Sequence, residues 1–176
     1  NLASANAYLA GARSVNENVE VLVRNGNTFS DSAKVKEIAS SLFSEGADVV
    51  YSDCGSGTLG AIEAASDAGK YCAGDATDHS SFAPGNVIID SMVSFSSGSY
   101  NICKMFVNGE LDGQPRYANY SNGGIGTIKN TSFVENCADS ELAAKMDEYW
   151  TIIDELEAKI ISGEVVPPND STNNWF

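Results

Sequence analysis

The sequence has no hydrophobic run that approaches the roughly 18 residues a membrane-spanning helix needs. Its first six residues also lack the basic start and apolar stretch of a signal peptide, which favours a mature, processed or truncated N-terminus. The 176 residues are enough for one domain with its own core, and a mean hydropathy of −0.16 is typical of a soluble globular protein.

Basic residues are scarce. Ten Lys and Arg stand against 24 Asp and Glu, which gives a formal net charge of −14. Such a charge repels phosphate backbones and anionic lipid surfaces, so the sequence predicts no nucleic-acid partner. A solvated acidic surface that favours solubility explains the charge by itself.

Metal-binding patterns are scarce too. The four cysteines form no CxxC pair and His79 is the only histidine, so no zinc site or other cofactor is predicted. If Cys54 closes one parallel strand and Cys72 opens the next, they lie at opposite ends of a sheet. That separation exceeds the ~4.4–6.8 Å between Cα atoms that a disulfide requires, so we expect free, buried thiols.

Strand and helix patterns alternate in the first half of the chain. Apolar, β-branched runs predict strands at residues 19–23, 48–53 and 71–74. The helix patterns between them have start and stop signals: Ser30 or Asp31 as N-cap, and Gly46 and Gly69 as C-terminal stops. A β-α-β-α-β run with short connections requires parallel strands and right-handed crossovers. The predicted fold class is α/β, a parallel sheet flanked by helices.

The flanking regions are less regular. A small-residue helix is expected at residues 6–14, and the polar, proline-containing stretch 75–85 has the composition of a hinge between lobes. Further elements are a strand at 86–93, a helix at about 97–108, a strand-like stretch at 116–120, a glycine-rich loop at 122–126, a long helix from Asp139 or Ser140 to Gly163, and a loose tail at 169–176.

A glycine-rich turn follows the predicted strand 48–53, with the spacing Gly55-x-Gly57-x-x-Gly60. A dinucleotide fingerprint has this spacing, but it follows the first strand and has an acidic residue about 20 positions on. Here the strand is not the first and Asp75 follows Gly60 by 15 positions. The favoured interpretation is a turn whose small residues let N–H groups at a helix start approach a polar ligand.

Other candidate ligand residues lie near strand ends. Phe29, in a polar loop, either stacks on a ligand or packs over the helix that follows it. Asp53, Asp75 and Asp78 either accept sugar hydroxyls or are ordinary turn and cap residues. His79 has no nucleophile at a recognisable spacing, so no catalytic residue is predicted. The predicted ligand-binding set is Phe29, Asp53, Gly55, Ser56, Gly57, Asp75 and Asp78.

The order of motifs resembles one known family. The series runs through Thr28-Phe29-Ser30-Asp31, Cys54-Gly55-Ser56-Gly57-Thr58-Leu59-Gly60, Ala68-Gly69-Lys70-Tyr71, Phe82-Ala83-Pro84-Gly85, Val107-Asn108-Gly109-Glu110-Leu111, Asn122-Gly123-Gly124-Ile125-Gly126 and Ser162-Gly163-Glu164-Val165-Val166-Pro167. From about Ala7 to Pro168 it resembles the C-terminal half of the BMP (basic membrane protein) family, the purine-nucleoside-receptor-like lipoproteins that serve ABC importers.

The resemblance implies a type I periplasmic-binding-protein architecture with two α/β lobes, three hinge crossings and a nucleoside in the cleft. Residues 1–76 and 115–168 would build the C-terminal lobe, residues 77–114 would cross to the N-terminal lobe, and residues 169–176 would be a tail. It also implies a non-enzymatic protein that delivers its ligand to an ABC permease. Its place would be extracytoplasmic, at the cell surface or in the periplasm, with a lipid anchor.

Two departures from the family pattern matter. The N-terminal lobe is absent, so apolar residues of the segment 77–114 (Val87, Ile88, Ile89 and Phe106) would lose about 1.5–3 kcal/mol per side chain in water. A lost N-terminal part, a second chain or an intermolecular exchange would supply the partner.

The second departure is in the hinge. Ala76 stands where the family has a ligand-holding aspartate and Ser94 where it has a lysine, whereas Phe29 and Gly55 are retained. The leading hypothesis is an ABC-importer solute-binding protein, or a fragment of one, that holds a nucleoside-like molecule. The alternative is a structural or self-assembling module that reuses the fold with an eroded pocket.

Overall fold

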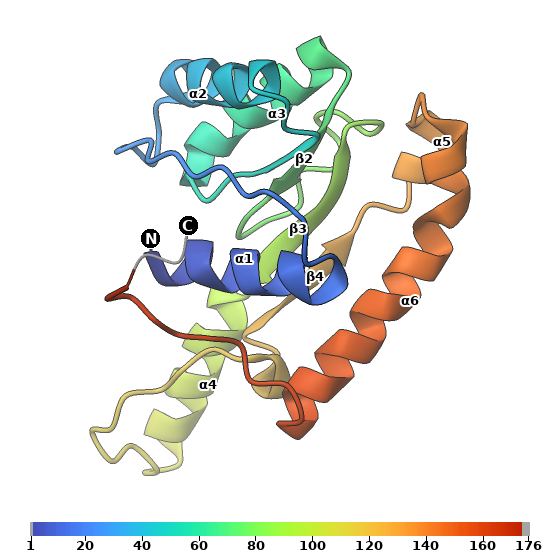
Figure 1. Cartoon of the computed structure of the whole chain (residues 1–176). Coiled ribbons are helices and arrows are strands. Elements are labelled where there is room, and N and C mark those ends of the chain that lie inside the picture. Colours follow the sequence, from blue (N-terminus) through green and yellow to red (C-terminus); the bar gives the residue numbers. More distant parts are fainter. Residues whose placement is uncertain (1, 174–176) are drawn as a thin grey trace. The chain divides into compact units, whose positions relative to one another are not determined.

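Figure 1 shows a computed structural model of the chain, in which residues 2–173 are described. Residues 26–151 form one compact unit, and residues up to 25 form another with those from 152 onward. The elements, in chain order, are α1 Leu2–Val15, α2 Ser32–Ser44, β1 Val49–Tyr51, the 3-10 turn η1 Gly55–Gly57, α3 Thr58–Ala68, β2 Tyr71–Gly74, β3 Val87–Val93, α4 Phe95–Val107, the 3-10 turn η2 Tyr120–Asn122, β4 Ile125–Lys129, α5 Phe133–Asn136 and α6 Ser140–Ser162.

The sheet has the strand order β1-β2-β3-β4. Strands β1, β2 and β3 are parallel, with Val50 opposite Cys72 and Gly74 opposite Asp90. Strand β4 then pairs antiparallel with β3. The predicted class, an α/β sheet flanked by helices, is confirmed. The sheet is mixed rather than purely parallel, because β4 runs antiparallel to its neighbour β3.

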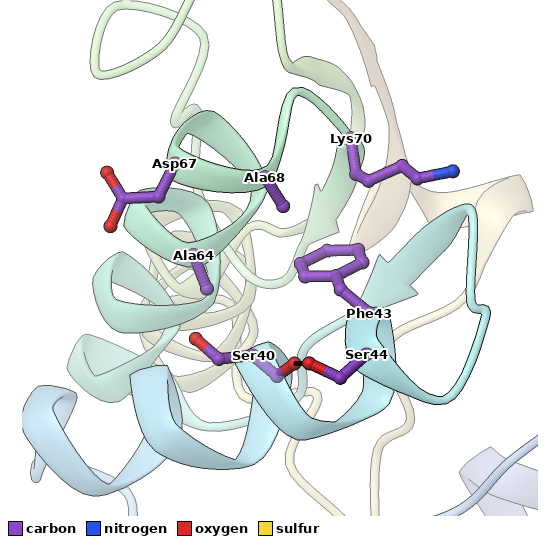
Figure 2. A pocket seen from close by; sticks show the side chains of 7 residues that line it. All are labelled: Ser40, Phe43, Ser44, Ala64, Asp67, Ala68 and Lys70. Atoms are coloured by element: carbon purple, nitrogen blue, oxygen red, sulfur yellow. Dashed lines mark hydrogen bonds between the residues drawn. The ribbon is translucent and has the colours of Figure 1, made fainter.

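Helices α2 and α3 begin and end at the predicted signals. The Asp31 side chain caps α2 by accepting a hydrogen bond from the Lys34 amide at 3.0 Å. Gly69 ends α3 in the left-handed conformation, with φ 63°, which glycine adopts without a steric penalty. Between the two helices lies a pocket of about 310 Å³, whose lining side chains are shown in Figure 2: Ser40, Phe43, Ser44, Ala64, Asp67, Ala68 and Lys70.

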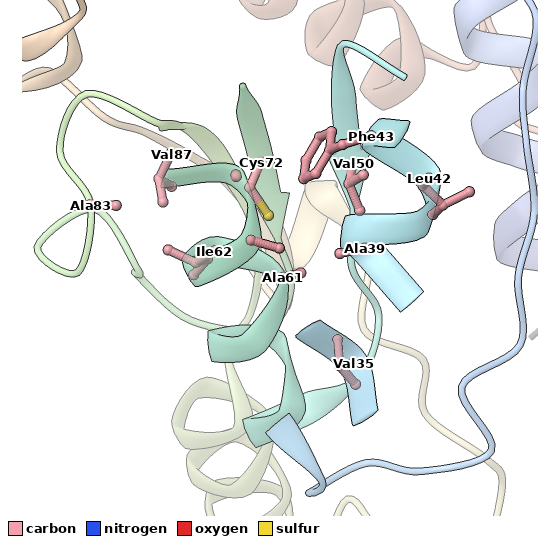
Figure 3. Packing of buried hydrophobic residues seen from close by; sticks show 12 residues of the cluster. Val35, Ala39, Leu42, Phe43, Val50, Ala61, Ile62, Cys72, Ala83 and Val87 are labelled. Atoms are coloured by element: carbon pink, nitrogen blue, oxygen red, sulfur yellow. The ribbon is translucent and has the colours of Figure 1, made fainter. Parts of the chain in front are cut away.

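The main core joins α2 and α3 to the strands (Figure 3). Val50, Cys72 and Val87 come from successive parallel strands and lie in one buried cluster with Ile62 of α3. A Cβ at Gly60 would collide with the Ser32 carbonyl oxygen, so only glycine lets the two helices approach this closely.

Two predicted strands are not formed. Residues 19–23 are described without strand structure, and Leu22 is 41% exposed. Residues 116–120 are also irregular up to η2, where the side chains of Asn119 and Asn122 each accept a hydrogen bond from the other's amide. Both predictions were wrong because a strand needs a neighbouring strand to pair with its backbone. At residues 119–122 asparagine side chains provide local hydrogen-bond partners for the backbone instead.

Helix α4 contains no buried residue. Phe95 is 74% exposed and Phe106 is 71% exposed, so the helix lacks a covering partner in the described chain, as expected. The expectation that apolar residues of the segment 77–114 lack a covering partner was wrong for strand β3, because Val87 is fully buried in the core with α3. The crossing of residues 77–114 into another lobe stays a prediction.

The other compact unit holds α1 and the C-terminal segment. The amide of the buried Asn6 side chain donates hydrogen bonds to the carbonyl oxygens of Asp170 at 2.9 Å and Asn173 at 2.8 Å. Residues 170–173 of the predicted tail are therefore anchored on α1, whereas residues 174–176 lie outside the described residues.

All four cysteines are free, as predicted. Only Cys72 is fully buried, and Cys103 on α4 is exposed, so the prediction that the thiols are buried holds for one of them. Burial raises the pKa of Cys72 to about 12, which keeps this thiol protonated at physiological pH.

Candidate functional site

Two of the predicted ligand residues meet at the carboxyl ends of β1 and β2. Asp53 follows β1 and Asp75 follows β2, and these strands are parallel neighbours with Tyr51 opposite Ala73. The side chains of Asp53 and Asp75 are close enough to hydrogen bond. The structure therefore brings together a pair of carboxyls at the edge where open α/β sheets bind ligands.

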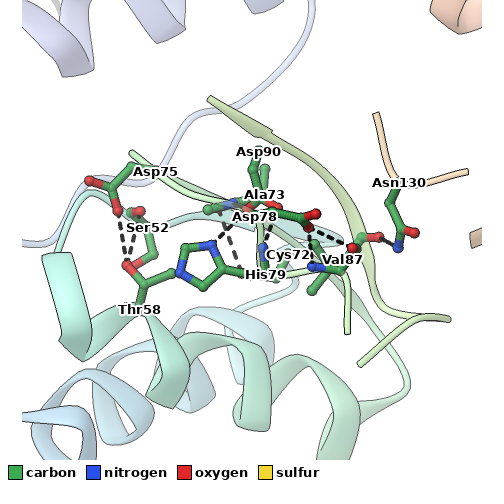
Figure 4. A network of polar contacts seen from close by, with 12 residues as sticks. Ser52, Thr58, Cys72, Ala73, Asp75, Asp78, His79, Val87, Asp90 and Asn130 are labelled. Atoms are coloured by element: carbon green, nitrogen blue, oxygen red, sulfur yellow. Dashed lines mark hydrogen bonds and ion pairs between the residues drawn. The ribbon is translucent and has the colours of Figure 1, made fainter. Parts of the chain in front are cut away.

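The Asp75 carboxyl is partly buried, and its neighbours shift its pKa in both directions. Burial raises its pKa above the ordinary value, the hydrogen bond from Thr58 lowers it, and the charge of Asp53 raises it again. Thr58 Oγ1 donates to Asp75 Oδ1 at 3.1 Å and also lies 3.1 Å from Ser52 Oγ (Figure 4). The pair is thus suited to hydrogen-bond donors supplied by a ligand.

One further side chain, Tyr51, borders this pair, and sequence reasoning missed it. Tyr51 interacts with Ser91 of β3, with Tyr120 of η2 and with both carboxyls, and burial raises its pKa. The strand-end position of Tyr51 is a signal that could have found it. Tyr120 is a neighbour of Tyr51 that comes from a distant turn, which no local pattern indicates.

The glycine-rich turn packs tightly against its neighbours. Gly55 has φ +53°, and a Cβ there would lie 2.8 Å from the Phe29 carbonyl oxygen, which also accepts a hydrogen bond from Ser56 Oγ at 3.3 Å. A Cβ at Gly57 would lie 3.0 Å from Val35 Cγ2. Close packing against the Phe29 loop and α2 therefore explains the glycine spacing without a dinucleotide. Gly57 is buried, which leaves Gly55 and Ser56 as the accessible residues of the predicted turn.

Phe29 lies beside this turn with its side chain largely in solvent. It is 71% exposed, so the ring does not pack over α2 in the way the alternative interpretation requires. An exposed aromatic ring next to accessible main-chain and hydroxyl groups is available for stacking on a ligand.

Asp78 has a more local role. Its Oδ1 accepts hydrogen bonds from the amide of Ser80 at 2.9 Å and from the Ser80 hydroxyl at 2.5 Å. These bonds hold the pKa of Asp78 below its ordinary value. Among the described contacts none joins Asp78 to the Asp53 and Asp75 pair, so it acts as the cap of its own turn.

The backbone between Asp75 and Asp78 is strained. Ala76 has φ +66°, and the Thr77 amide donates to the Asp75 carbonyl oxygen at 2.8 Å, which is the pattern of a γ-turn. A non-glycine residue in such a conformation costs on the order of 1–3 kcal/mol and clusters at functional sites. The strain falls on the position where the family resemblance aligns an aspartate.

Two other kinds of site receive no support. Within residues 2–173, no group of three or more His, Cys, Asp or Glu side chains is arranged to hold a metal ion. The pocket between α2 and α3 contains none of the predicted ligand residues.

None of the helices within residues 2–173 is both long and apolar enough to span a membrane.

The fold places the chain in a known structural class. It is similar to an ABC transporter system solute-binding protein from Aeropyrum pernix K1, with a TM-score of 0.75 and 22% identity over 93% of this chain and 53% of that one. A second solute-binding protein, from Conexibacter woesei DSM 14684, has a TM-score of 0.68 and 18% identity over 96% and 53% of the two chains. The fold is thus that of the ABC solute-binding proteins.

The chain belongs to the Bmp family, described as ABC transporter substrate-binding protein PnrA-like, whose model matches residues 2–164. It is 30% identical to basic membrane protein D of Borreliella burgdorferi (strain JD1) over 136 residues, 75% of this chain and 40% of that protein. Basic membrane protein A of Borreliella afzelii is 28% identical over 171 residues, 92% and 47% of the two. The family predicted from the motif series is confirmed, and the chain spans less than half the length of these relatives.

Proposed function

We propose that this chain is the C-terminal, ligand-binding lobe of an ABC-importer substrate-binding protein that holds a nucleoside-like molecule without changing it. The observation that carries the proposal is the sheet edge where Asp53 and Asp75 meet, beside the glycine-rich turn and the exposed Phe29. Membership of the Bmp family supports the same role.

The chemistry of this edge suits a nucleoside. An aromatic base stacks on an exposed aromatic ring such as Phe29, and ribose hydroxyls donate hydrogen bonds to carboxylates such as Asp53 and Asp75. The Ser56 hydroxyl and the neighbouring amides offer further polar contacts. Membership of a substrate-binding family makes binding, rather than catalysis, the proposed activity.

We further propose the setting that the family implies. The partner is an ABC permease, and the protein works outside the cytoplasm, at the cell surface or in the periplasm, with a lipid anchor. The N-terminal lobe, supplied by a longer chain or a second one, would close the other side of the cleft. Residues 77–114 would cross to it, and the exposed apolar side chains of α4 support such a contact.

Isothermal titration calorimetry of the full-length native protein tests the proposal. Adenosine, guanosine, inosine and their free bases form the ligand panel, and we expect micromolar or tighter binding for at least one nucleoside. Phe29→Ala and Asp53→Asn should each weaken that binding by at least tenfold. Tyr149→Ala, which removes an exposed aromatic ring of α6, is the matched control and should leave the affinity unchanged. No binding across the whole panel would contradict the proposal.

The second candidate function is a structural or self-assembling module that has lost the pocket. Helix α4 favours it, because Phe95, Tyr100, Phe106 and Val107 are all exposed on one short helix. Light scattering of the purified protein separates the two functions. Concentration-dependent assembly without nucleoside binding would support the module, and a monodisperse monomer with an occupied cleft would exclude it.

A further inference from the structure

Asp90 is a buried carboxylate outside the predicted set of ligand residues. It lies on β3 opposite Gly74 of β2 and is 1% exposed. Its Oδ1 accepts a hydrogen bond from the Gly74 amide at 3.0 Å, and its Oδ2 accepts one from the His79 amide at 2.9 Å. The Nδ1 atom of the His79 ring also lies 3.0 Å from Oδ1 (Figure 4).

The two amides bound to Asp90 bracket the loop that carries Asp75. Gly74 ends β2 just before the loop, and His79 follows it. One side chain from the middle of the sheet therefore holds both ends of residues 75–78. The strained backbone at Ala76 lies between these two anchors. Strained residues persist only where the surroundings over-determine their conformation, and the anchors provide that constraint.

The local sequence is adapted to this arrangement. A Cβ at Gly74 would collide with Asp90 Oδ1 and would lie 2.7 Å from His79 Nδ1. Glycine at this strand end therefore allows the carboxylate and the imidazole to reach the main chain. His79 is buried together with Asp90, so both groups make these contacts away from solvent.

Stability alone is a weak reason for this carboxylate. Burying a charged group is costly, and well-packed apolar residues of similar volume often give equal or greater stability. An apolar residue at position 90, however, could not accept hydrogen bonds from two main-chain amides at once. The carboxylate therefore specifies the path of the loop, and the path of the loop decides where Asp75 points.

We propose that Asp90, acting together with His79, is the positioning residue that holds Asp75 in place for ligand binding. The proposal rests on the proposed function, in which Asp75 contacts the ligand. Asp90 itself acts through the main chain and does not contact the ligand.

The test compares Asp90→Asn, His79→Gln and a control, Met146→Ala, in the full-length native protein. Asp90→Asn keeps the volume but replaces one acceptor oxygen with a donor, whereas His79→Gln keeps a side-chain N–H donor. Met146 is buried in α6, so its truncation should lower Tm without touching the loop. Two quantities are measured: amide hydrogen exchange at Thr77, whose N–H bonds to Asp75, and the affinity for adenosine, guanosine and inosine.

We expect Asp90→Asn to accelerate exchange at Thr77 by at least tenfold and to weaken nucleoside binding by at least tenfold, with His79→Gln less affected. Met146→Ala should change neither the exchange rate at Thr77 nor the nucleoside affinity, even if it lowers Tm as much as Asp90→Asn does. Thr77 exchange at the wild-type rate in Asp90→Asn, or an equal acceleration in Met146→Ala, would overturn the positioning role. If the wild-type protein binds none of the three nucleosides, the proposed function fails, and Thr77 exchange still decides the role of Asp90.

Discussion

Helices α3 and α4 differ in what covers them, although each follows a parallel strand or its connecting turn. Six residues of α3 are buried, and four of them belong to the core that α3 forms with α2 and the sheet: Ala61, Ile62, Ala64 and Ala65. None of α4 is buried, although its sequence separates apolar from polar residues at least as clearly. Amphipathicity therefore indicates that a helix has a face to cover, but it does not say whether the same chain supplies the cover.

The largest expected difference between the two helices comes from truncating their large apolar side chains. Ile62→Ala in α3 should lower the free energy of unfolding by about 2–5 kcal/mol, because it leaves a cavity in the core. Phe106→Ala in α4 should change it by less than about 0.5 kcal/mol, because that ring is already in solvent. Urea denaturation of this chain measures both values, and a large loss for Phe106→Ala would show that α4 is covered.

Two glycines give a smaller, matched test. Gly60→Ala should destabilise the protein by about 1–3 kcal/mol or more, because the new methyl group would collide with the backbone of α2. Gly98→Ala in α4 meets no atom within 4 Å and should stabilise the helix by about 0.5–1 kcal/mol. Thermal denaturation of the two variants should therefore move Tm in opposite directions. A fall in Tm for Gly98→Ala would contradict the open environment of α4.

The smallest expected effect is the pH dependence of stability that Asp75 causes. Asp75 follows β2 and accepts a hydrogen bond from Thr58, the first residue of α3. Its pKa is raised in the folded protein, so the folded state favours the protonated carboxyl. This contribution to stability is fully present below the unfolded pKa of about 3.9 and is lost as the pH rises through the raised folded pKa. Because the group is partly exposed, the effect is modest.

Asp75→Asn removes this titration, so the variant should lose less stability than the wild-type protein as the pH rises from about 4 through the raised folded pKa of Asp75. Unfolding curves at a series of pH values give the comparison. Asp78→Asn is the control with the opposite sign, because the pKa of Asp78 is lowered by the hydrogen bonds from Ser80. A parallel pH dependence of wild type and Asp75→Asn would show that Asp75 does not titrate as described.

Much of the fold around α2 and α3 could be predicted because its signals are local. Asp31 caps α2 with its own side chain, and Gly69 ends α3 through its own backbone. The sequence also placed Asp53, Asp75 and Asp78 near strand ends, and the first two lie together because the ends of neighbouring parallel strands meet at one edge. Strand β4 and the two absent strands could not be predicted in this way, because a strand depends on a partner that its own residues do not specify.

The glycine spacing shows the limit of motif reasoning most clearly. Gly55, Gly57 and Gly60 have the spacing of a cofactor fingerprint, but the structure uses them to admit the Phe29 loop, Val35 and the backbone of α2. The short distance from Gly60 to Asp75 already argued against a cofactor, but only their neighbours show what the three glycines do. The role of each glycine depends on the atoms that a Cβ would contact, and most of those atoms belong to other segments of the chain.

By itself the sequence determined the limits of α2 and α3, the family, and the places of Asp53 and Asp75 near strand ends, because each depends on short-range spacing or on an ordered series of motifs. Of the three parallel strands it predicted, residues 19–23 form none. The tertiary structure alone decided that β4 runs antiparallel, that Tyr120 lies near Tyr51 and that Asp90 bonds to both ends of the Asp75 loop. These features are contacts between segments far apart in the chain. Their energies depend on distance and burial in the folded state, which no local pattern records.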